Sequence, residues 1–304
     1  MVLPQFQSWV VRTSEGTGMA NAMHVNVARA GLVAIGLLVM LAAGEGKAQP
    51  PTVEWGTYLG GTGKDSCNGI AVDSSGNVYA TGMTPSSGWV SGGWDTTHNG
   101  GSDGYVVKLD TAGAHQWSSY LGGAGSESGY GIAVDSSGNV YVTGITYSSG
   151  WVSGGWDTTL GGTLDGYVVK LDTAGAHMWS SYLGGAGSES GYGIAVDSSG
   201  NVYVTGTTYS SGWVSGGWDT TLGGTLDGYV VKLDTTGAHL WSSYLGGASD
   251  EQGLDIAVDS SGNVYATGFT HSSGWVSGGW DTTHNGGSDG YVVKLDTAGA
   301  HQWS

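Results

Sequence analysis

The sequence predicts an all-β fold assembled from one short unit repeated in tandem, and three observations lead to this prediction. Tryptophan recurs every 62 residues without insertion or deletion, at positions 55, 117, 179, 241 and 303. The chain holds 60 Gly, 14 Trp and 16 Tyr but only 4 Pro and 2 Phe, which is typical of many short strands joined by glycine-rich turns. Short segments also alternate apolar and polar residues. A strict long period indicates one supersecondary unit stacked on its own copies.

Residues 1–48 are expected to be an N-terminal extension with a secretory signal peptide, and residues 49–304 the repeat domain. The one long apolar run, 31–44, follows Arg29 and leads to Gly46-Lys47-Ala48, a small-x-small cleavage pattern. At 14 residues the run is too short to span a membrane. We therefore expect an exported protein, at the cell surface, in the periplasm or outside the cell, with no membrane span in the mature chain.

The charge balance of the mature chain excludes one class of partner. Residues 1–48 hold two of the 25 acidic and three of the 8 basic residues, which leaves 23 acidic residues against five lysines and a net charge of about −18. Affinity for a phosphate backbone needs clustered cations. Nucleic acid is therefore not an expected partner.

The second copy, 117–178, shows how one unit is built. Residues 131–135 and 139–143 have the pattern of short strands joined by a tight polar turn. A long connection then leads to a third strand at 165–172 and a fourth at 177–183. Four antiparallel strands per unit form the blade of a β-propeller. The four 62-residue repeats run over 55–116, 117–178, 179–240 and 241–302.

Three linked motifs carry a resemblance to a known family. They are Tyr-Leu-Gly-Gly at 58–61, Ile-Ala-Val-Asp-Ser-Ser-Gly-Asn-Val-Tyr at 70–79 and Asp-Gly-Tyr-Val-Val-Lys-Leu-Asp at 103–110, each with its copies. This combination resembles the bacterial β-propeller repeat family called SBBP, over residues 53–304. The resemblance implies a secreted or surface propeller, commonly seven-bladed. It transfers no catalytic residue, since the family has none to transfer.

A calcium-loaded β-solenoid is the competing fold. The segments 161–166 and 286–290 echo the Gly- and Asp-rich repeats of such proteins. Those repeats recur about every nine residues, whereas this chain repeats every 62. The period therefore favours the propeller.

The phase of the repeat bears on whether the propeller closes. Residues 53–61 are expected to be an orphan outermost strand, while the fourth unit's own outer strand begins at 301–304. The chain then has four inner hairpins but five outer strands, the last of which is cut short. We expect four blades of a larger propeller. A four-bladed ring with a frayed tail and an open arc that closes by self-association are the alternatives.

Candidate binding residues lie on the loops that follow the second and fourth strands of each blade, and propeller connectivity places both loops on one rim. Each rim segment offers two tryptophans and one acid, a set that suits stacking on sugar rings and hydrogen bonds to hydroxyls. The residues are Trp89, Trp94, Trp151, Trp156, Trp213, Trp218, Trp275 and Trp280, with Asp65, Glu127, Glu189 and Glu251. The competing interpretation is that the tryptophans fill the core between blades.

These residues define the functional hypotheses. The first is a non-enzymatic binding or scaffold module at the cell surface, for a glycan or a protein. The second is a polysaccharide lyase or hydrolase that uses the rim carboxylates, and the third a purely structural adhesin or spacer. Catalysis usually needs an asymmetric set of groups, and only copy four departs in that way, with Asp250, Glu251, Gln252 and Asp255.

Other recurring polar residues have structural explanations. The Asp-Ser-Ser-Gly-Asn turns lack the alternating carboxylates of a calcium loop, and their Asp and Asn side chains suit backbone capping. The histidines at 115, 177, 239 and 301 are expected to be surface imidazoles on the side opposite the tryptophans. The lysines at 108, 170, 232 and 294 are expected to form solvated charge ladders with nearby aspartates. No cofactor or metal is expected.

Identity between copies is not evidence of functional constraint. Copies two and three differ only at Ile145/Thr207, Ala174/Thr236 and Met178/Leu240. Such sameness indicates recent duplication, in which turn residues and surface residues are copied alike.

Overall fold

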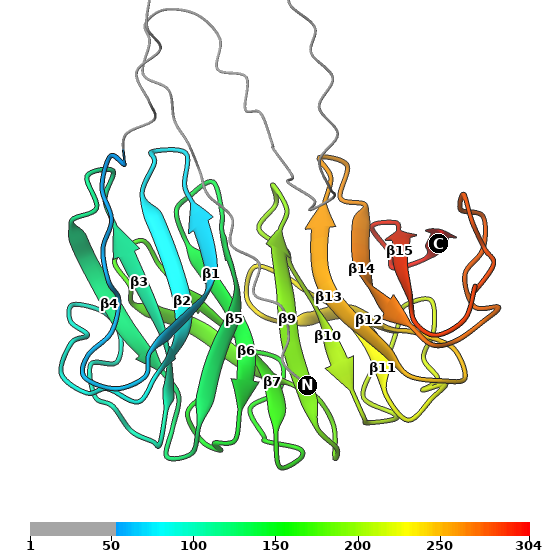
Figure 1. The fold of residues 1–304 in the computed structure, drawn as a ribbon, viewed down its shortest axis with the longest axis horizontal. Coiled ribbons are helices and arrows are strands. Elements are labelled where there is room, and N and C mark those ends of the chain that lie inside the picture. The colour runs from blue at the N-terminus through cyan, green and yellow to red at the C-terminus, as the bar shows by residue number, and fades with distance from the viewer. Residues whose placement is uncertain (1–52) are drawn as a thin grey trace, which may run out of the picture. The chain divides into compact units, whose positions relative to one another are not determined.

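The computed structural model describes residues 53–304, and in this part of the chain every regular element is a β-strand (Figure 1). The expected signal peptide, at 1–48, lies outside the described residues. Sixteen strands form four separate antiparallel sheets of four strands each, and within each sheet the strands follow chain order. This is the all-β, four-stranded blade predicted from the repeat.

The strand bounds keep nearly the same phase in all four sheets. The first sheet holds β1 (Ser66–Val72), β2 (Val78–Thr84), β3 (Asp103–Leu109) and β4 (His115–Leu121). The second holds β5 (Glu127–Val134), β6 (Val140–Thr146), β7 (Asp165–Leu171) and β8 (His177–Leu183). The third holds β9 (Glu189–Val196), β10 (Val202–Thr208), β11 (Asp227–Leu233) and β12 (His239–Leu245). The fourth holds β13 (Glu251–Val258), β14 (Val264–Thr270), β15 (Asp289–Leu295) and β16 (His301–Trp303).

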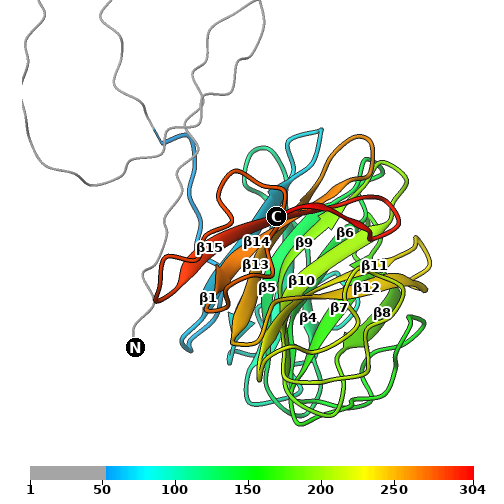
Figure 2. The ribbon, with the colours of Figure 1, turned by 90° about the vertical axis from the view of Figure 1, so that its right-hand side faces the viewer.

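Within residues 57–304 the first strands of consecutive sheets lie side by side. β1 packs on β5, β5 on β9, and β9 on β13, while β4, β8 and β12 are the outermost strands of their sheets (Figures 1 and 2). The arc is open between the first and fourth sheets. Its two end faces are uncovered, since Ile70 on β1 is 64% exposed and Val292 on β15 is 47% exposed.

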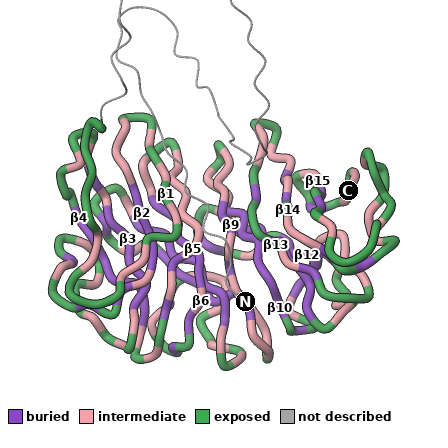
Figure 3. The backbone as a smooth tube through the Cα atoms, in the orientation of Figure 1, coloured by how far each residue is buried: buried purple, intermediate pink, exposed green. Residues whose placement is uncertain are grey.

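The core lies between the sheets, as expected for blades that cannot bury both faces alone. One cluster joins Tyr79 and Trp117 of the first sheet to Val140 and Tyr167 of the second. Equivalent clusters join the second sheet to the third and the third to the fourth. Buried residues therefore follow the middle of the strands, while the loops are mostly exposed (Figure 3).

The outermost strand of each of the first three blades contacts the next blade through a tryptophan. In β8, Trp179 is only 3% exposed, and its Nε1 donates a hydrogen bond to the backbone oxygen of Thr235, 3.1 Å away, in the β11–β12 turn. Gly237 lies beneath the indole, with a φ of +83°, and a Cβ there would be 2.7 Å from the ring. The repeating Trp is thus a blade-to-blade contact, and the turn glycine leaves room for it.

The long loop after the second strand covers the free edge of its own sheet. Backbone oxygens of Ser153 and Asp157 accept hydrogen bonds from the amides of Ser180 and Tyr182 on β8, at 2.7 and 2.8 Å. These amides lie on the free edge of the sheet, because β8 is its outermost strand and they donate to the loop. The loop therefore satisfies an edge that would otherwise be open to pairing with another chain.

One expected strand is absent. Residues 53–61 were predicted to be an orphan outermost strand, but they form no strand in the structure. Their sequence matches that of β4, β8 and β12, which each lie against a third strand. No third strand lies beside this segment, and a strand requires a neighbour for its backbone groups.

Candidate functional site

The first tryptophan of each long loop belongs to the core of its blade. The Trp151 ring meets the ring of Tyr167 edge-on, with centroids 5.1 Å apart, and its Nε1 donates to Thr146 Oγ1 at 3.0 Å. Both contacts recur in every blade. The tryptophans in this position are Trp89, Trp151, Trp213 and Trp275.

The second tryptophan reaches across to the next blade. Trp156 stacks on His239, with centroids 4.2 Å apart and an interplanar angle of 25°. Trp94 and Trp218 stack in the same way on His177 and His301. The prediction that the histidines lie on the opposite side from the tryptophans is therefore wrong. The long loop does not stay at one end of the blade but runs back along the outermost strand, which brings the two rings together.

The stacked histidines have lost part of their contact with water. Nε2 of His177 lies 2.9 Å from Ser180 Oγ, and burial lowers the pKa of His177. Desolvation lowers the pKa of His239 and of His301 in the same direction. These imidazoles favour the neutral form as inter-blade packing groups.

The glutamates predicted for the rim are buried. Glu127, Glu189 and Glu251 are at most 2% exposed. In the second blade, Glu127 accepts hydrogen bonds from Thr146 Oγ1 and from the amide of Gly123, both at 2.9 Å. Asp65 is half-buried and accepts from Thr84 and Gly61 in the same pattern. These carboxylates accept hydrogen bonds within the connection between blades. Because the three glutamates are buried there, they cannot contact a ligand.

A second buried carboxylate accompanies each of these glutamates from the preceding blade. Asp165, at the start of β7, accepts hydrogen bonds from the amides of Gly161 and Gly162 at 2.8 and 3.0 Å. Burial raises the pKa of Asp165 to about 6, and the negative charge of Glu189 adds to this. Asp227 has the same surroundings beside Glu251, and its pKa is also raised to about 6, chiefly by burial. No local pattern indicates these acid pairs, because the two members of each pair lie on different blades.

The aspartates that recur in the Asp-Ser-Ser-Gly-Asn turns act as turn caps. The carboxylate of Asp135 accepts from the amides of Ser137 and Asn139, from the Asn139 side chain and from the Tyr141 hydroxyl, at 2.8 to 2.9 Å. These bonds occupy both oxygens and lower the pKa of Asp135 in spite of its partial burial. Among residues 53–304 no group of three or more His, Cys, Asp or Glu side chains is placed to hold a metal.

The predicted solvated lysine ladders are wrong for the inner blades. Lys170 and Lys232 are 5% and 7% exposed. The Nζ of Lys170 donates to the backbone oxygen of Thr235 in the next blade at 3.0 Å and lies 5.2 Å from the centre of the Tyr141 ring. Desolvation lowers its pKa. These lysines therefore tie blades together beside the tryptophan lock.

Copy four does not gather its distinctive residues into one site. Glu251 is buried, whereas Asp250 and Asp255 are exposed. Asp255 stands on β13 where the second and third copies have glycine, and its carboxylate accepts from the amide of Ile256. The asymmetry therefore remains spread along one strand.

Two exposed tyrosines were missed by sequence reasoning. Tyr147 and Tyr209 begin the long loops of the second and third blades and are 49% and 52% exposed. Their amides donate to the backbone oxygens of Ser126 and Ser188, at 3.2 Å, which fixes each residue to the connection between blades. In the fourth blade His271 takes this position and bonds to Asp250 O at 3.1 Å. An aromatic residue directly after the buried second strand was the available signal.

Comparison with known proteins agrees with the architecture. The Beta-propeller repeat model, SBBP, matches four segments, at 54–87, 116–150, 179–212 and 240–274. The chain is 31% identical over 153 residues to an uncharacterized WD repeat-containing protein of Acanthamoeba polyphaga mimivirus, an alignment that covers 45% of this chain and 11% of that protein. It is 28% identical over 144 residues to the regulatory protein FlaEY of Caulobacter vibrioides, which covers 46% of this chain and 15% of that protein.

The alignments cover too small a part of the two relatives to carry the function of a whole protein over to this chain. The aligned region is a small part of either relative, so the similarity concerns the repeat and not a whole protein. In the described residues no helix is long and apolar enough to cross a membrane.

The four matches fall in the phase of the 62-residue period and each includes the first two strands of one blade. The chain is a β-propeller repeat protein and belongs to the SBBP family.

Proposed function

We propose that this protein is an exported, non-enzymatic binding module that binds a basic protein partner. The partner binds on the face of the blades where the long loops begin, at Tyr147, Tyr209 and His271. The observation that supports the proposal is the row formed by Tyr147, Tyr209 and His271, which occupy the same position in three consecutive blades with their backbones held by hydrogen bonds. Tyrosines fixed in this way offer contact area at a small cost in conformational entropy.

Charge defines the kind of partner. The chain carries a net charge of −17, and its lysines in the inner blades are buried in contacts between blades. An acidic surface attracts cationic partners and speeds their association, and exposed tyrosine rings bind lysine and arginine side chains by cation–π contact. A protein segment that carries basic residues fits both features.

The burial of the glutamates argues against the enzyme hypothesis. Glu127 and Glu189 use their oxygens within the fold, and neither faces an open cleft. A general acid or base must come within hydrogen-bond distance of its substrate. A binding or scaffold role uses the exposed side chains instead. The proposal of export depends on the signal peptide expected at residues 1–48. Cleavage of this peptide would leave a mature protein that begins at Gln49, and finding that protein would support export.

A glycan ligand is the second candidate. Trp94 is 36% exposed beside its stacked histidine, and Trp156 and Trp218 are half-buried in the same position. A partly open indole face is the group on which sugar rings stack. This version of the proposal depends on the second tryptophans alone, since the first ones lie inside the blades.

A capture experiment tests the proposal. The immobilised protein is incubated with cell-surface proteins, and the parent is compared with a Tyr147→Ala/Tyr209→Ala variant. Met178→Ala/Leu240→Ala is the matched control, because these residues are 49% and 48% exposed in the same two blades but lie near the opposite end. We expect capture to fall at least tenfold only in the tyrosine variant, and to weaken with salt.

The contradicting results are specific. Equal capture by both double variants would remove the tyrosine row from the binding surface. Binding to a glycan array that Trp156→Ala abolishes, with no protein captured, would replace the protein partner by a glycan.

A further inference from the structure

The first strand of each blade carries a β-bulge that leaves one residue out of the pairing with the second strand. In β5 the register shifts between Gly129 and Gly131, so Tyr130 is the extra residue. In β9, Tyr192 is the extra residue at the same point. A bulge bends its strand and re-aims a side chain. Two neighbouring inner strands therefore each present a tyrosine outside the regular alternation of the sheet.

These two residues and Tyr147 form what we call the tyrosine cluster. The ring centroids of Tyr130 and Tyr192 are 5.5 Å apart, and the rings are tilted by 41°. Tyr147, at the start of the long loop of the second blade, is 49% exposed. Burial raises the pKa of Tyr130, and the nearby Tyr192 and Tyr147 hydroxyls raise it further. Because the rings come from β5, β9 and the loop after β6, the cluster spans the junction of the second and third blades.

Buried acids lie at the same end of the second blade as Tyr147. Glu127 on β5 is opposite Thr146 on β6, which is opposite Asp165 on β7. Both acids are at most 2% exposed, and Asp165, with its pKa of about 6, is mainly ionised at pH 7. The one lysine of the second repeat, Lys170, lies at the other end of β7. The end that carries the cluster is therefore negative and favours a bound cation.

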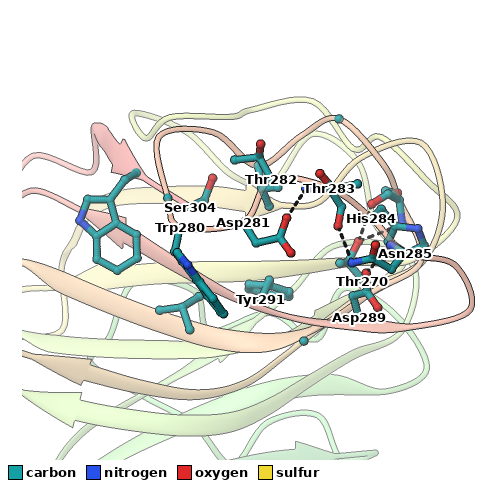
Figure 4. Close-up of a pocket in the computed structure, with 17 residues that line it drawn as sticks. Thr270, Trp280, Asp281, Thr282, Thr283, His284, Asn285, Asp289, Tyr291 and Ser304 are labelled. Atoms are coloured by element: carbon teal, nitrogen blue, oxygen red, sulfur yellow. Dashed lines mark hydrogen bonds between the residues drawn. The ribbon is translucent and has the colours of Figure 1, made fainter.

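The surroundings of the tyrosine cluster are supplied by the described part of the chain. β5 packs on β1 and β9, and β9 packs on β13, so the second and third blades each have a neighbour on both sides. A pocket of about 520 Å³ beside β15 is a separate feature, on the uncovered face of the fourth blade (Figure 4). Trp280 and Tyr291 help to line that pocket, and none of the three clustered tyrosines does. The cluster therefore does not depend on what covers the end faces of the arc.

Tyrosine rings beside buried negative charge suit a guanidinium group. An arginine side chain is planar, stacks on aromatic faces and is more weakly hydrated than the ammonium group of lysine. We propose that the tyrosine cluster binds an arginine side chain of the basic protein partner, with the guanidinium stacked against the rings of Tyr130 and Tyr192. This inference rests on the proposed function and adds to it the residue type that the partner presents.

Peptide binding to the full chain tests the site. Calorimetry measures the affinity for tri-arginine, tri-lysine and tri-citrulline peptides, because citrulline has the shape of arginine without its charge. We expect the parent to bind tri-arginine about tenfold more tightly than tri-citrulline, and about threefold more tightly than tri-lysine.

Leucine is the replacement that the fold already accepts at the bulge, since Leu254 is the extra residue of β13. We expect Tyr130→Leu/Tyr192→Leu to lower the affinity for tri-arginine about fivefold or more. Tyr130→Phe/Tyr192→Phe keeps the rings and should stay within about twofold of the parent. Met178→Ala/Leu240→Ala, near the opposite end of the same two blades, is the control and should bind like the parent.

Equal affinity of the parent for tri-arginine and tri-citrulline, or for tri-arginine and tri-lysine, would overturn the inference. The capture experiment separates this result from a failure of the proposed function. Capture that requires Tyr147 and Tyr209, together with tri-arginine binding that the leucine variant retains, overturns the arginine site alone. Equal capture by the parent and the Tyr147→Ala/Tyr209→Ala variant, together with tri-arginine binding that the leucine variant loses, supports the site and removes the proposed partner.

Discussion

At the scale of single residues, a tryptophan and a glycine together form the contact that joins neighbouring blades. A Trp on each of β4, β8 and β12 lies over the turn of the next blade, and the glycine beneath it has a left-handed backbone that few other residues adopt. The 62-residue Trp period could be read from the sequence, but its partner glycine could not. The two residues are 58 positions apart for Trp179 and Gly237, and nothing local links them.

Replacement of that glycine tests the contact. Gly237→Ala places a methyl group 2.7 Å from the Trp179 ring in addition to straining a φ of +83°, so we expect a loss of about 2–4 kcal/mol in the free energy of unfolding. Gly212→Ala is the control, because its φ is +79° and nothing lies within 4 Å of the added carbon. It should cost only about 1 kcal/mol. Urea denaturation measures both, and equal losses would show that the indole yields to the methyl group.

Charged residues show where residue-level prediction fails. Lys170 and Glu127 are types that are almost never buried unless paired, and sequence alone therefore placed them at the surface. In the structure each is buried at a boundary between blades, where backbone groups or hydroxyls of the chain satisfy it. The turn aspartates were predicted correctly, since their partners lie within six residues. Local partners can be read from a pattern, and partners on another blade cannot.

At the scale of elements, the strands followed from alternation and the long loop did not. The fourth strand predicted at 177–183 coincides with β8, and the others differ by a few residues at their ends. Its paired tryptophans had made this loop a candidate binding site. It is instead an edge cover, whose hydrogen bonds reach the outermost strand through backbone atoms and leave no sequence signature.

Amide exchange tests the edge cover. The Ser181 hydroxyl accepts a hydrogen bond from the amide of Asp157 at 2.9 Å and so holds the loop against β8. Loss of a bond of this kind costs about 1 kcal/mol, or about a fivefold change in local opening. We expect Ser181→Ala to speed exchange at the Tyr182 amide by about that factor, while Ser199→Ala, in an exposed turn, leaves it unchanged. Equal exchange rates in the parent and in Ser181→Ala would show that the loop does not protect the edge of the sheet.

At the scale of the whole molecule, each junction between blades holds a pair of carboxylates, which makes stability depend on pH. Asp227 has a pKa of about 6 in the folded protein, against about 3.9 in an unfolded chain. A raised pKa means that the folded state binds the proton more tightly. The stability that Asp227 contributes is therefore complete below pH 4 and is lost as the pH rises through 6.

The prediction concerns the difference between parent and variant, because His177, His239 and His301 have lowered pKa values and act in the opposite direction below pH 6.5. We expect the parent to exceed Asp227→Asn in urea midpoint most at pH 4.5, and this advantage to shrink steadily towards pH 7. Asp234→Asn is the control. The pKa of Asp234 is lowered by hydrogen bonds from Thr236 and neighbouring amides, so its contribution stays constant over this range. A difference for Asp227→Asn that is flat from pH 4.5 to 7 would mean that the acid pair holds no proton, and that the blades meet there through hydrogen bonds alone.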